Sequence, residues 1–282
     1  MNRTFGVIGG DRRQAELARL LAADGHMVFT YGLERWGCVE TELETAAECE
    51  TVLLPLPLCV EEGILHGEKP LFTAEVFRRL RPQQRILAGQ VRPGQRREAA
   101  EYGLTLEDYF LREELVVANA AITAECAVQT AMERLDRTLL GMDCLVLGFG
   151  RIGRFLCQRL HGMGARVTAA ARRPETLAEI MGCGWQAEDI NALSGKLLSF
   201  GAVFNTVPSP ILDAALLAQL PGDGLCVELA SVQGIDLAAA QALGLPNVWA
   251  RALPGRLRPK SAAAAIRDAV YYILKKERGE PV

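Results

Sequence analysis

The chain carries one pattern of apolar and polar positions at two places. Residues 5–15, FGVIGGDRRQA, and residues 145–155, LVLGFGRIGRF, each run from a short apolar stretch through a glycine turn into a segment with helical spacing. A short apolar run bounded by glycine is typical of a buried strand, and apolar residues recurring every three to four positions are typical of a helix. Each place is therefore predicted to form a strand, a turn and the start of a helix.

The same alternation continues along both halves of the chain. In the first half, strands are predicted at 4–9, 27–31, 51–55, 85–89 and 104–106, and helices at 12–24, 72–80 and 94–101. A long alanine-rich helix at 119–140 then interrupts the rhythm. In the second half, strands are predicted at 143–148, 165–170, 202–206, 225–229 and 247–250, and helices at 151–162, 174–181, 212–220, 236–243 and 261–276.

This order of elements predicts an α/β protein with two doubly wound parallel-sheet domains. The first domain spans 1–118 and is joined by the C-terminal helix at 259–282. The second spans 119–258 and contains the interdomain helix and a Rossmann dinucleotide-binding domain. Because long helices bracket the second domain, we expect two long crossing helices to link the domains, and a ligand cleft between them.

Composition narrows the classes of function. The 282 residues are 50% hydrophobic and 23% charged with a net charge of −3, which is typical of a soluble globular protein and not of a nucleic-acid-binding one. The most apolar run, TVLLPLPLCV at 51–60, is too short and too rich in proline to span a bilayer, so no membrane partner is expected. Because a buried strand is already predicted at 4–9, no signal peptide is expected.

The cysteines and histidines show no spacing typical of a metal site. The eight cysteines form no CxxC pair, which predicts reduced thiols, a cytoplasmic protein and no bound metal. His26, His66 and His161 have no triad partner at a useful spacing and are expected to be structural or exposed.

The second glycine turn has the spacing of a dinucleotide-binding motif. Gly148, Gly150 and Gly153 follow the strand DCLVL in the order G-x-G-x-x-G and open the helix that begins RIGRF. The first glycine permits the tight turn, the second lets the pyrophosphate approach, and the third packs the helix on the strand. The N–H groups at the helix start then face the phosphate. The alternative is a Rossmann-type domain without a ligand.

The end of the next strand indicates which dinucleotide is bound. An NAD site places an acidic residue there, on the ribose 2′-hydroxyl. The sequence instead has Ala170 and Ala171, followed by Arg172 and Arg173. Since arginine binds phosphate bidentately and stacks on adenine, NADP is predicted over NAD. The alternative is that both arginines cover a solvent-facing surface.

Further cofactor contacts are expected from the loops at the carboxyl ends of the strands, beyond which the nicotinamide lies. The predicted cofactor-binding residues are Gly148, Phe149, Gly150, Arg151, Ile152, Gly153, Ala171, Arg172, Arg173, Asn205, Thr206, Val207, Pro208, Ala230 and Ser231.

The first glycine turn, GGDRRQ at 9–14, lacks the third glycine. Asp11 stands at the predicted N-cap, where its carboxylate would satisfy the N–H groups of the helix itself. The first domain is therefore not expected to bind the dinucleotide. Arg12 and Arg13 could meet a substrate carboxylate, or could be exposed first-turn arginines.

Several stretches together resemble the A subunit of bacterial dipicolinate synthase. They are VIGGDRR (7–13), NAAITAECA (119–127), VLGFGRIG (146–153), HGMGARVTAAARR (161–173), VFNTVPSPIL (203–212), VELASVQGID (227–236) and ALPGRLRPKSAAAAI (252–266). The resemblance covers nearly the whole chain. It implies an N-terminal domain joined to a Rossmann domain similar to those of D-2-hydroxyacid dehydrogenases and adenosylhomocysteinase.

The resemblance also implies a reaction and a partner. The chain would work with the flavoprotein-like B subunit of dipicolinate synthase, in the cytoplasm of the mother cell of a sporulating bacterium. Together they would produce dipicolinate by NADP-dependent oxidation of dihydrodipicolinate, or from its hydroxylated tetrahydro precursor. Association of the chain with copies of itself is left open.

A dicarboxylate substrate needs cationic or amide donors, and its oxidation needs removal of a hydride and loss of a ring proton. Glu125 and Lys260 are the predicted catalytic residues, acting as acid or base after burial shifts their pKa. The predicted substrate-binding residues are Gly10, Asp11, Arg12, Asn119, Thr123, Pro254 and Gly255, with Arg256 and Arg258 as further candidates. An N-cap role for Asn119 and a first-turn hydroxyl role for Thr123 are the alternatives.

Two other functions are considered. Because no general base is obvious, the chain could be a non-catalytic NADP-binding protein that regulates or scaffolds a partner. A 2-hydroxyacid dehydrogenase is disfavoured, because it would need a His–Glu pair late in the chain. The comparable stretches, ELASVQGID and WARALPGRLRPK, contain no histidine.

Overall fold

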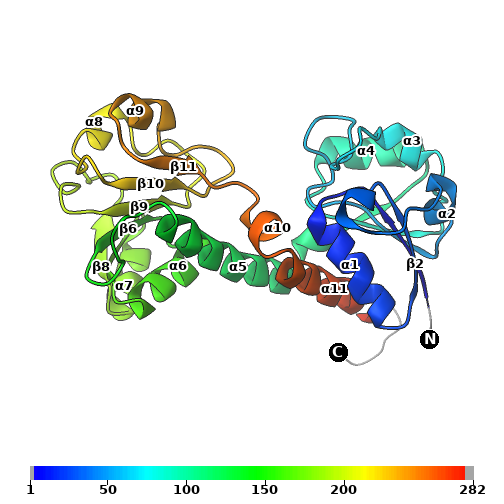
Figure 1. Cartoon of the computed structure of the whole chain (residues 1–282). Coiled ribbons are helices and arrows are strands. Elements are labelled where there is room, and N and C mark those ends of the chain that lie inside the picture. The colour runs from blue at the N-terminus through cyan, green and yellow to red at the C-terminus, as the bar shows by residue number, and fades with distance from the viewer. Residues whose placement is uncertain (1–2, 277–282) are drawn as a thin grey trace. The chain divides into compact units, whose positions relative to one another are not determined.

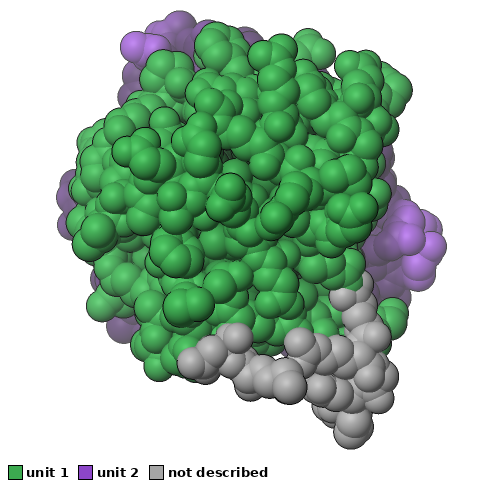
Figure 2. All heavy atoms as spheres, turned by 90° about the vertical axis from the view of Figure 1, so that its right-hand side faces the viewer, with its two compact units in different colours: residues 1–119, 254–282 green, residues 120–253 purple. Residues whose placement is uncertain are grey.

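The computed structural model describes residues 3–276 and divides the chain into two compact units. Unit 1 comprises residues 1–119 and 254–282, and unit 2 comprises residues 120–253, coloured green and purple in Figure 2. Residues 254–258, assigned from the sequence to the second domain, therefore belong to unit 1. The reason is local packing, because Gly255 lies directly against Asp11 and Arg13.

Unit 1 is built on a parallel sheet of five strands in the order β2-β1-β3-β4-β5. The strands are β1 (Thr4–Ile8), β2 (Met27–Tyr31), β3 (Thr51–Leu53), β4 (Arg85–Ala88) and β5 (Leu106–Asp108). The helices are α1 (Arg12–Ala23), α2 (Leu43–Ala47), α3 (Thr73–Phe77), α4 (Pro93–Glu101), α10 (Leu253–Leu257) and α11 (Pro259–Lys276), with 3-10 turns η1 (Glu34–Trp36) and η2 (Tyr109–Leu111).

Helices cover both faces of this sheet. On one face, α1 and α11 pack on each other and on β1, and Leu17 and Leu21 share a buried core with Ile266 and Val270 (Figure 1). The other face buries a second core contributed by α2, α3 and α4. The C-terminal helix thus completes the apolar core of a sheet formed from the other end of the chain.

Unit 2 is a parallel sheet of six strands in the order β11-β10-β9-β6-β7-β8. The strands are β6 (Asp143–Leu147), β7 (Arg166–Ala171), β8 (Gln186–Asp189), β9 (Ala202–Asn205), β10 (Leu225–Glu228) and β11 (Asn247–Trp249). Helices α6 (Arg151–Gly162) and α7 (Pro174–Gly182) lie on one face, and α8 (Ala214–Leu217) and α9 (Leu237–Ala242) lie on the other (Figure 1). This is the strand order of a Rossmann domain, so the predicted fold class is confirmed.

The long helix α5 (Glu113–Met132) corrects the prediction of a helix at 119–140. Two glutamates in its first turn, Glu113 and Glu114, favour an earlier start because negative charge stabilises a helix N-terminus. Asn119 therefore lies inside the helix and is not its N-cap. The boundary between the two units falls within α5, whereas α11 belongs to unit 1 alone.

Within residues 3–276, α5 is also the one helix long and apolar enough to cross a membrane, by length and composition only. Half of that helical window is buried inside the protein. The core helix of a soluble protein passes the same test, so this is weak evidence for a membrane span.

Candidate dinucleotide site

The three glycines of the second turn differ in their surroundings. Gly148 has a φ of +95°, and a Cβ there would lie 2.5 Å from Thr206 Oγ1. A Cβ on Gly153 would overlap the carbonyl oxygen of Gly148. Gly150 is exposed, and a Cβ there would meet nothing within 4 Å. Two glycines are thus required by the fold, and the third leaves open space at the helix start.

The N-terminus of α6 offers its backbone to a ligand. Gly150 is the N-cap, no side chain caps the helix, and no acidic residue lies in the first turn. The first N–H groups of a helix have no partner within the helix, and the helix dipole makes this end positive. The turn therefore fits the pyrophosphate of a dinucleotide.

Phe149, in the middle of this turn, points its ring away from the open space. The ring is buried, packs edge-on against Trp185 with centroids 5.8 Å apart, and carries the Arg154 guanidinium 5.0 Å from its centroid. A contact of Phe149 with a cofactor would therefore have to come from its backbone. Arg151 is exposed and Ile152 is half-buried in the first turn of α6.

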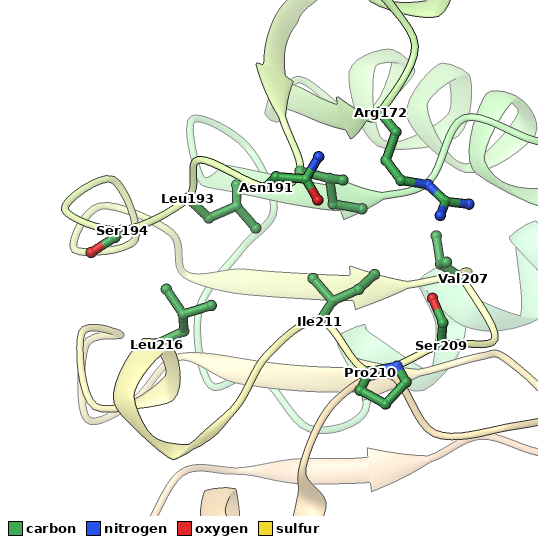
Figure 3. Close-up of a pocket in the computed structure, with 10 residues that line it drawn as sticks. Arg172, Asn191, Leu193, Ser194, Val207, Ser209, Pro210, Ile211 and Leu216 are labelled. Atoms are coloured by element: carbon green, nitrogen blue, oxygen red, sulfur yellow. The ribbon is translucent and has the colours of Figure 1, made fainter.

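A pocket of about 290 Å³ lies at the end of β7 (Figure 3). It is lined by Arg172, Ile190, Asn191, Leu193, Ser194, Val207, Ser209, Pro210, Ile211 and Leu216. In Figure 3 the Arg172 guanidinium lies at the same end of the pocket as Val207 and Ser209. A cation, two hydroxyls and aliphatic walls suit a nucleoside that carries a phosphate.

Only one of the two predicted arginines, Arg172, lines the pocket. Arg172 follows the buried Ala171 and lines the pocket, whereas Arg173 is the N-cap residue of α7 and lies outside that lining. Arg172 is the stronger candidate for a ligand contact, a distinction that the sequence could not make.

The predicted residues after β9 and β10 lie at the carboxyl edge of the same sheet. Thr206 donates its hydroxyl to the carbonyl of Leu147, 2.8 Å away, which ties this loop to the glycine turn. Pro208 and Ser231 are exposed, and Ala230 is buried. Asn205 is completely buried, so its side chain positions other residues and is not available to contact the cofactor directly.

The turn of unit 1 has different electrostatics. Asp11 is the N-cap of α1 and accepts a hydrogen bond from Arg13 N at 2.9 Å. The Arg13 guanidinium pairs with the same carboxylate at 2.7 Å and donates to the carbonyl of Leu56. Burial raises the pKa of Asp11, but the hydrogen bonds and charge of Arg13 outweigh burial and hold that pKa below its usual value. A carboxylate thus occupies the place that a phosphate would need.

Several predicted substrate residues gather around this carboxylate. Gly10 has a φ of +106°, and a Cβ on Gly255 would lie 2.7 Å from both the Asp11 carboxylate and the Arg13 guanidinium. Pro254 precedes Gly255 in α10 and is buried. The side chain of Arg12 is exposed and lies 3.9 Å from the Glu16 carboxylate.

The predicted catalytic pair is divided between the two units. Glu125 is exposed on the part of α5 that belongs to unit 2, and Lys260 is exposed in the first turn of α11 in unit 1. Thr123, two residues before Glu125, is buried. Neither unit by itself brings Glu125 and Lys260 together.

His66, which the sequence analysis expected to be structural or exposed, is a titratable candidate. It lines a small pocket of about 90 Å³ with Gly9 and Gly32, and its Nδ1 is buried without a hydrogen-bond partner. Burial lowers the pKa of His66 although the nearby Asp11 carboxylate opposes this shift. Asp11 and His66 are far apart in the sequence and belong to no common local motif. Spacing alone could therefore not indicate that they interact.

The part of the chain that the structure describes contains no group of three or more His, Cys, Asp or Glu that could hold a metal ion.

Comparison with known proteins supports the resemblance found in the sequence. Residues 4–110 match the family model that describes the N-terminal domain of the dipicolinate synthase A subunit. The A subunit of dipicolinate synthase from Bacillus subtilis is 26% identical over 286 residues, which cover 97% of this chain and 96% of that protein. The chain is thus similar to the dipicolinate synthase A subunit along nearly its whole length. The resemblance predicted from the sequence is confirmed.

Solved structures agree with this relationship. The A chain of dipicolinate synthase from B. subtilis superposes with a TM-score of 0.84 and 25% identity, covering 100% of this chain and 98% of that one. Apo D-lactate dehydrogenase from Escherichia coli superposes with a TM-score of 0.62 and 16% identity, covering 99% and 98%. The dehydrogenase shares the fold alone with this chain.

Proposed function

We propose that the chain is the A subunit of a dipicolinate synthase and oxidises dihydrodipicolinate to dipicolinate with NADP⁺. The observation that carries the proposal is the match along 97% of the chain to a protein named as the dipicolinate synthase A subunit. The geometry of unit 2 supports it, because Gly150 leaves the N-terminus of α6 open to a pyrophosphate.

The choice of NADP⁺ is supported by the end of β7. That strand ends at Ala171, which has no carboxylate to accept a hydrogen bond from a ribose 2′-hydroxyl. Arg172 follows it and lines the neighbouring pocket, where a guanidinium can bind a 2′-phosphate with two parallel hydrogen bonds.

The proposed reaction converts dihydrodipicolinate and NADP⁺ into dipicolinate, NADPH and one proton. Bound NADP⁺ supplies the acceptor for the hydride. Because aromatisation of the ring drives the reaction, the chain's main tasks are to orient the dicarboxylate and to accept one proton. We propose that cationic and amide side chains, among them Arg12, Asn119 and Lys260, hold the substrate carboxylates, and that Glu125 or Lys260 moves the proton.

The relatives are named as one of the subunits of a synthase, which supports the presence of a second protein in the active assembly. We propose that the chain acts with the flavoprotein-like B subunit of dipicolinate synthase in the cytoplasm of a sporulating bacterium.

The deciding experiment mixes the purified chain with NADP⁺ and freshly generated dihydrodipicolinate, with and without a candidate B subunit. We expect dipicolinate absorbance to develop with the wild-type chain and not with Gly150→Val. Binding of NADP⁺ without turnover in any combination would instead support a regulatory or scaffold role. Turnover of a 2-hydroxy acid in its place would support the dehydrogenase alternative.

A further inference from the structure

Glu228, the last residue of β10, is a completely buried carboxylate surrounded by N–H donors. Its Oε1 accepts from Ala230 N at 2.8 Å, and its Oε2 accepts from Gly234 N at 2.8 Å and Ile235 N at 2.9 Å. The side-chain amide of Asn205 donates to both oxygens, at 2.8 and 2.9 Å. Burying a charge is costly unless it is well hydrogen-bonded, so this arrangement fixes its surroundings tightly.

Asn205, on the neighbouring strand, extends the network. It is the last residue of β9 and stands opposite Glu228 in the parallel register. Its Nδ2 also donates to the carbonyl of Val207 at 2.9 Å, and its Oδ1 accepts from Val207 N at 3.1 Å. The side chain is therefore engaged at both ends, and it connects the Glu228 carboxylate to the loop that follows β9.

The network holds together the loops that follow the two strands. Gly234 has no room for a side chain, because a Cβ would overlap the Asn205 amide and lie 2.6 Å from Ser209 O. The carbonyl of Gly234 in turn accepts from Ile211 N and Leu212 N, at 2.8 and 3.0 Å. The segments 206–212 and 229–235 thus form one hydrogen-bonded assembly at the carboxyl edge of the sheet.

The two loops depend on Glu228 to different degrees. The 206–212 loop is also anchored by Thr206, whose N–H and hydroxyl both donate to Leu147 O. In the 229–235 loop, three backbone N–H groups end on the Glu228 carboxylate itself. Loss of that acceptor would therefore loosen the 229–235 loop most.

The position of the 229–235 loop indicates what it serves. In a Rossmann domain, the dinucleotide lies across the carboxyl ends of the strands at the switch in strand order, with its adenosine at one half of the sheet and its nicotinamide at the other. Here the switch lies between β6 and β9. Arg172 follows β7, and its pocket spans the switch, because it is also lined by Val207 and Ser209 of the 206–212 loop. The 229–235 loop contributes no residue to that pocket and follows β10, on the opposite side of the switch from β7.

We propose that Glu228 is a positioning residue for the nicotinamide half of the dinucleotide, acting through Asn205 and the 229–235 loop. This inference rests on the proposed function only in requiring that unit 2 binds NADP⁺. It does not require that the chain turns over dihydrodipicolinate.

The test compares two ligands on the full chain. NADP⁺ carries both halves, and 2′,5′-ADP carries the adenosine half with its 2′-phosphate but no nicotinamide. In Glu228→Gln, an amide N–H₂ replaces one acceptor and faces backbone donors. We expect the Kd of NADP⁺ to rise by roughly tenfold, and that of 2′,5′-ADP to change by less than about threefold.

Asp236→Asn is the matched control. It makes the same chemical change, and Asp236 also accepts a backbone N–H, from Ala239 at 2.9 Å, but it serves as the N-cap of α9. We expect this variant to leave both Kd values unchanged. Glu228→Asp keeps the charge on a shorter side chain. We expect it to weaken NADP⁺ relative to 2′,5′-ADP as well, but by less than Glu228→Gln does. This variant replaces Glu228→Gln in the test if Glu228→Gln does not fold.

A spectroscopic readout separates local loosening from general loss of structure. The indole of Trp249 donates to Ala230 O at 3.0 Å, so it reports on the 229–235 loop. In chain labelled with 5-fluorotryptophan, we expect Glu228→Gln to shift the fluorine resonance of Trp249, assigned with Trp249→Phe. The resonances of Trp36 and Trp185 should stay in place.

The possible outcomes distinguish a positioning role of Glu228 from a general structural role. Equal losses of both ligands, or shifts of all three resonances, would overturn the inference in favour of a general structural role. Unchanged NADP⁺ affinity in folded Glu228→Gln would also overturn it. If the wild-type chain binds neither ligand, the inference and the NADP⁺ assignment both fail. If it binds NADP⁺ without turnover, only the proposed enzymatic function fails.

Discussion

The two strand–glycine–helix turns differ in what occupies the start of the helix. In unit 1, the Asp11 carboxylate caps α1 and pairs with Arg13. In unit 2, Gly150 begins α6 with no capping side chain and open space around it. The positive end of a helix can be satisfied by the chain's own carboxylate or left for an anionic ligand. One residue at the N-cap therefore separates a self-contained turn from a phosphate site.

Replacing Gly150 with valine tests this comparison most strongly. Because no atom lies within 4 Å of the added Cβ, the variant should fold, but its side chain should occupy the space that the pyrophosphate needs. We expect NADP⁺ affinity to fall by roughly 100-fold or more, measured by calorimetric titration. Gly162→Val, at the other end of α6 and also in open space, is the control. Unchanged affinity in folded Gly150→Val would disprove the site.

The Asp11 carboxylate in the glycine turn of unit 1 should make the stability of that unit depend on pH. The pKa of Asp11 is lower in the folded chain than when unfolded, so its contribution is present above about pH 5 and is lost as pH falls below about 4. Asp11→Asn keeps an N-cap side chain but loses the charged hydrogen bonds to Arg13, which should cost about 2 kcal/mol near neutral pH.

Hydrogen exchange of the α1 amides is the measurement for Asp11→Asn, because it reports on unit 1 alone. The difference between wild type and variant should shrink on acidification. A difference that stays constant from pH 7 to pH 3 would contradict a stabilising role for the ionised carboxylate.

Lys260→Ala asks whether unit 1 contributes to the reaction while unit 2 binds the nucleotide. We expect turnover with the B subunit present to fall by roughly tenfold, because one charged contact to the substrate is lost, and NADP⁺ binding to stay nearly intact. Lys275→Ala, in the last turn of the same helix, is the control. Glu125→Gln tests in parallel whether that residue moves a proton. Normal turnover in both variants would place the substrate elsewhere, with the turn at 9–13 as the next candidate.

The smallest expected effect concerns cofactor choice. Replacing Arg172 and Arg173 together should weaken NADP⁺ by about tenfold and leave NAD⁺ unchanged, since charged hydrogen bonds to the 2′-phosphate are lost. Because Arg172 lines the pocket, Arg172→Ala should account for most of this effect. Arg166→Ala, at the amino end of β7 and paired with Asp143, is the control. Equal losses for both cofactors would show that neither arginine reads the 2′-phosphate.

Much of the fold could be predicted, because apolar runs identify buried strands. The predictions for β1 and β6 match their observed positions to within one residue at each end. Strand β8 could not be predicted in this way, because its sequence QAED is polar and lies at the sheet edge. The predicted position of α5 is too late in the chain, because the sequence ERLDRTLL that follows Met132 contains no glycine or proline to mark the end of the helix.

The candidate site, too, has parts that the sequence could predict and parts that it could not. The glycine turn could be identified because its function depends on backbone conformation within six consecutive residues. The bond between Asn205 and Glu228 could not, because it joins the ends of two strands 23 residues apart. The same holds for Asp11 and His66, whose charges interact although they are separated by an even longer stretch of chain.

The sequence by itself determined where most of the strands and helices and the glycine turn lie, because periodicity, capping and backbone freedom act between near neighbours. Only the tertiary structure decided that Arg172 and not Arg173 faces the pocket, that Phe149 turns its ring into the core, and that Glu228 holds the loop after β10. Each of these depends on which side chains the parallel sheet brings to its carboxyl edge. That arrangement arises from strand order, which no local pattern contains.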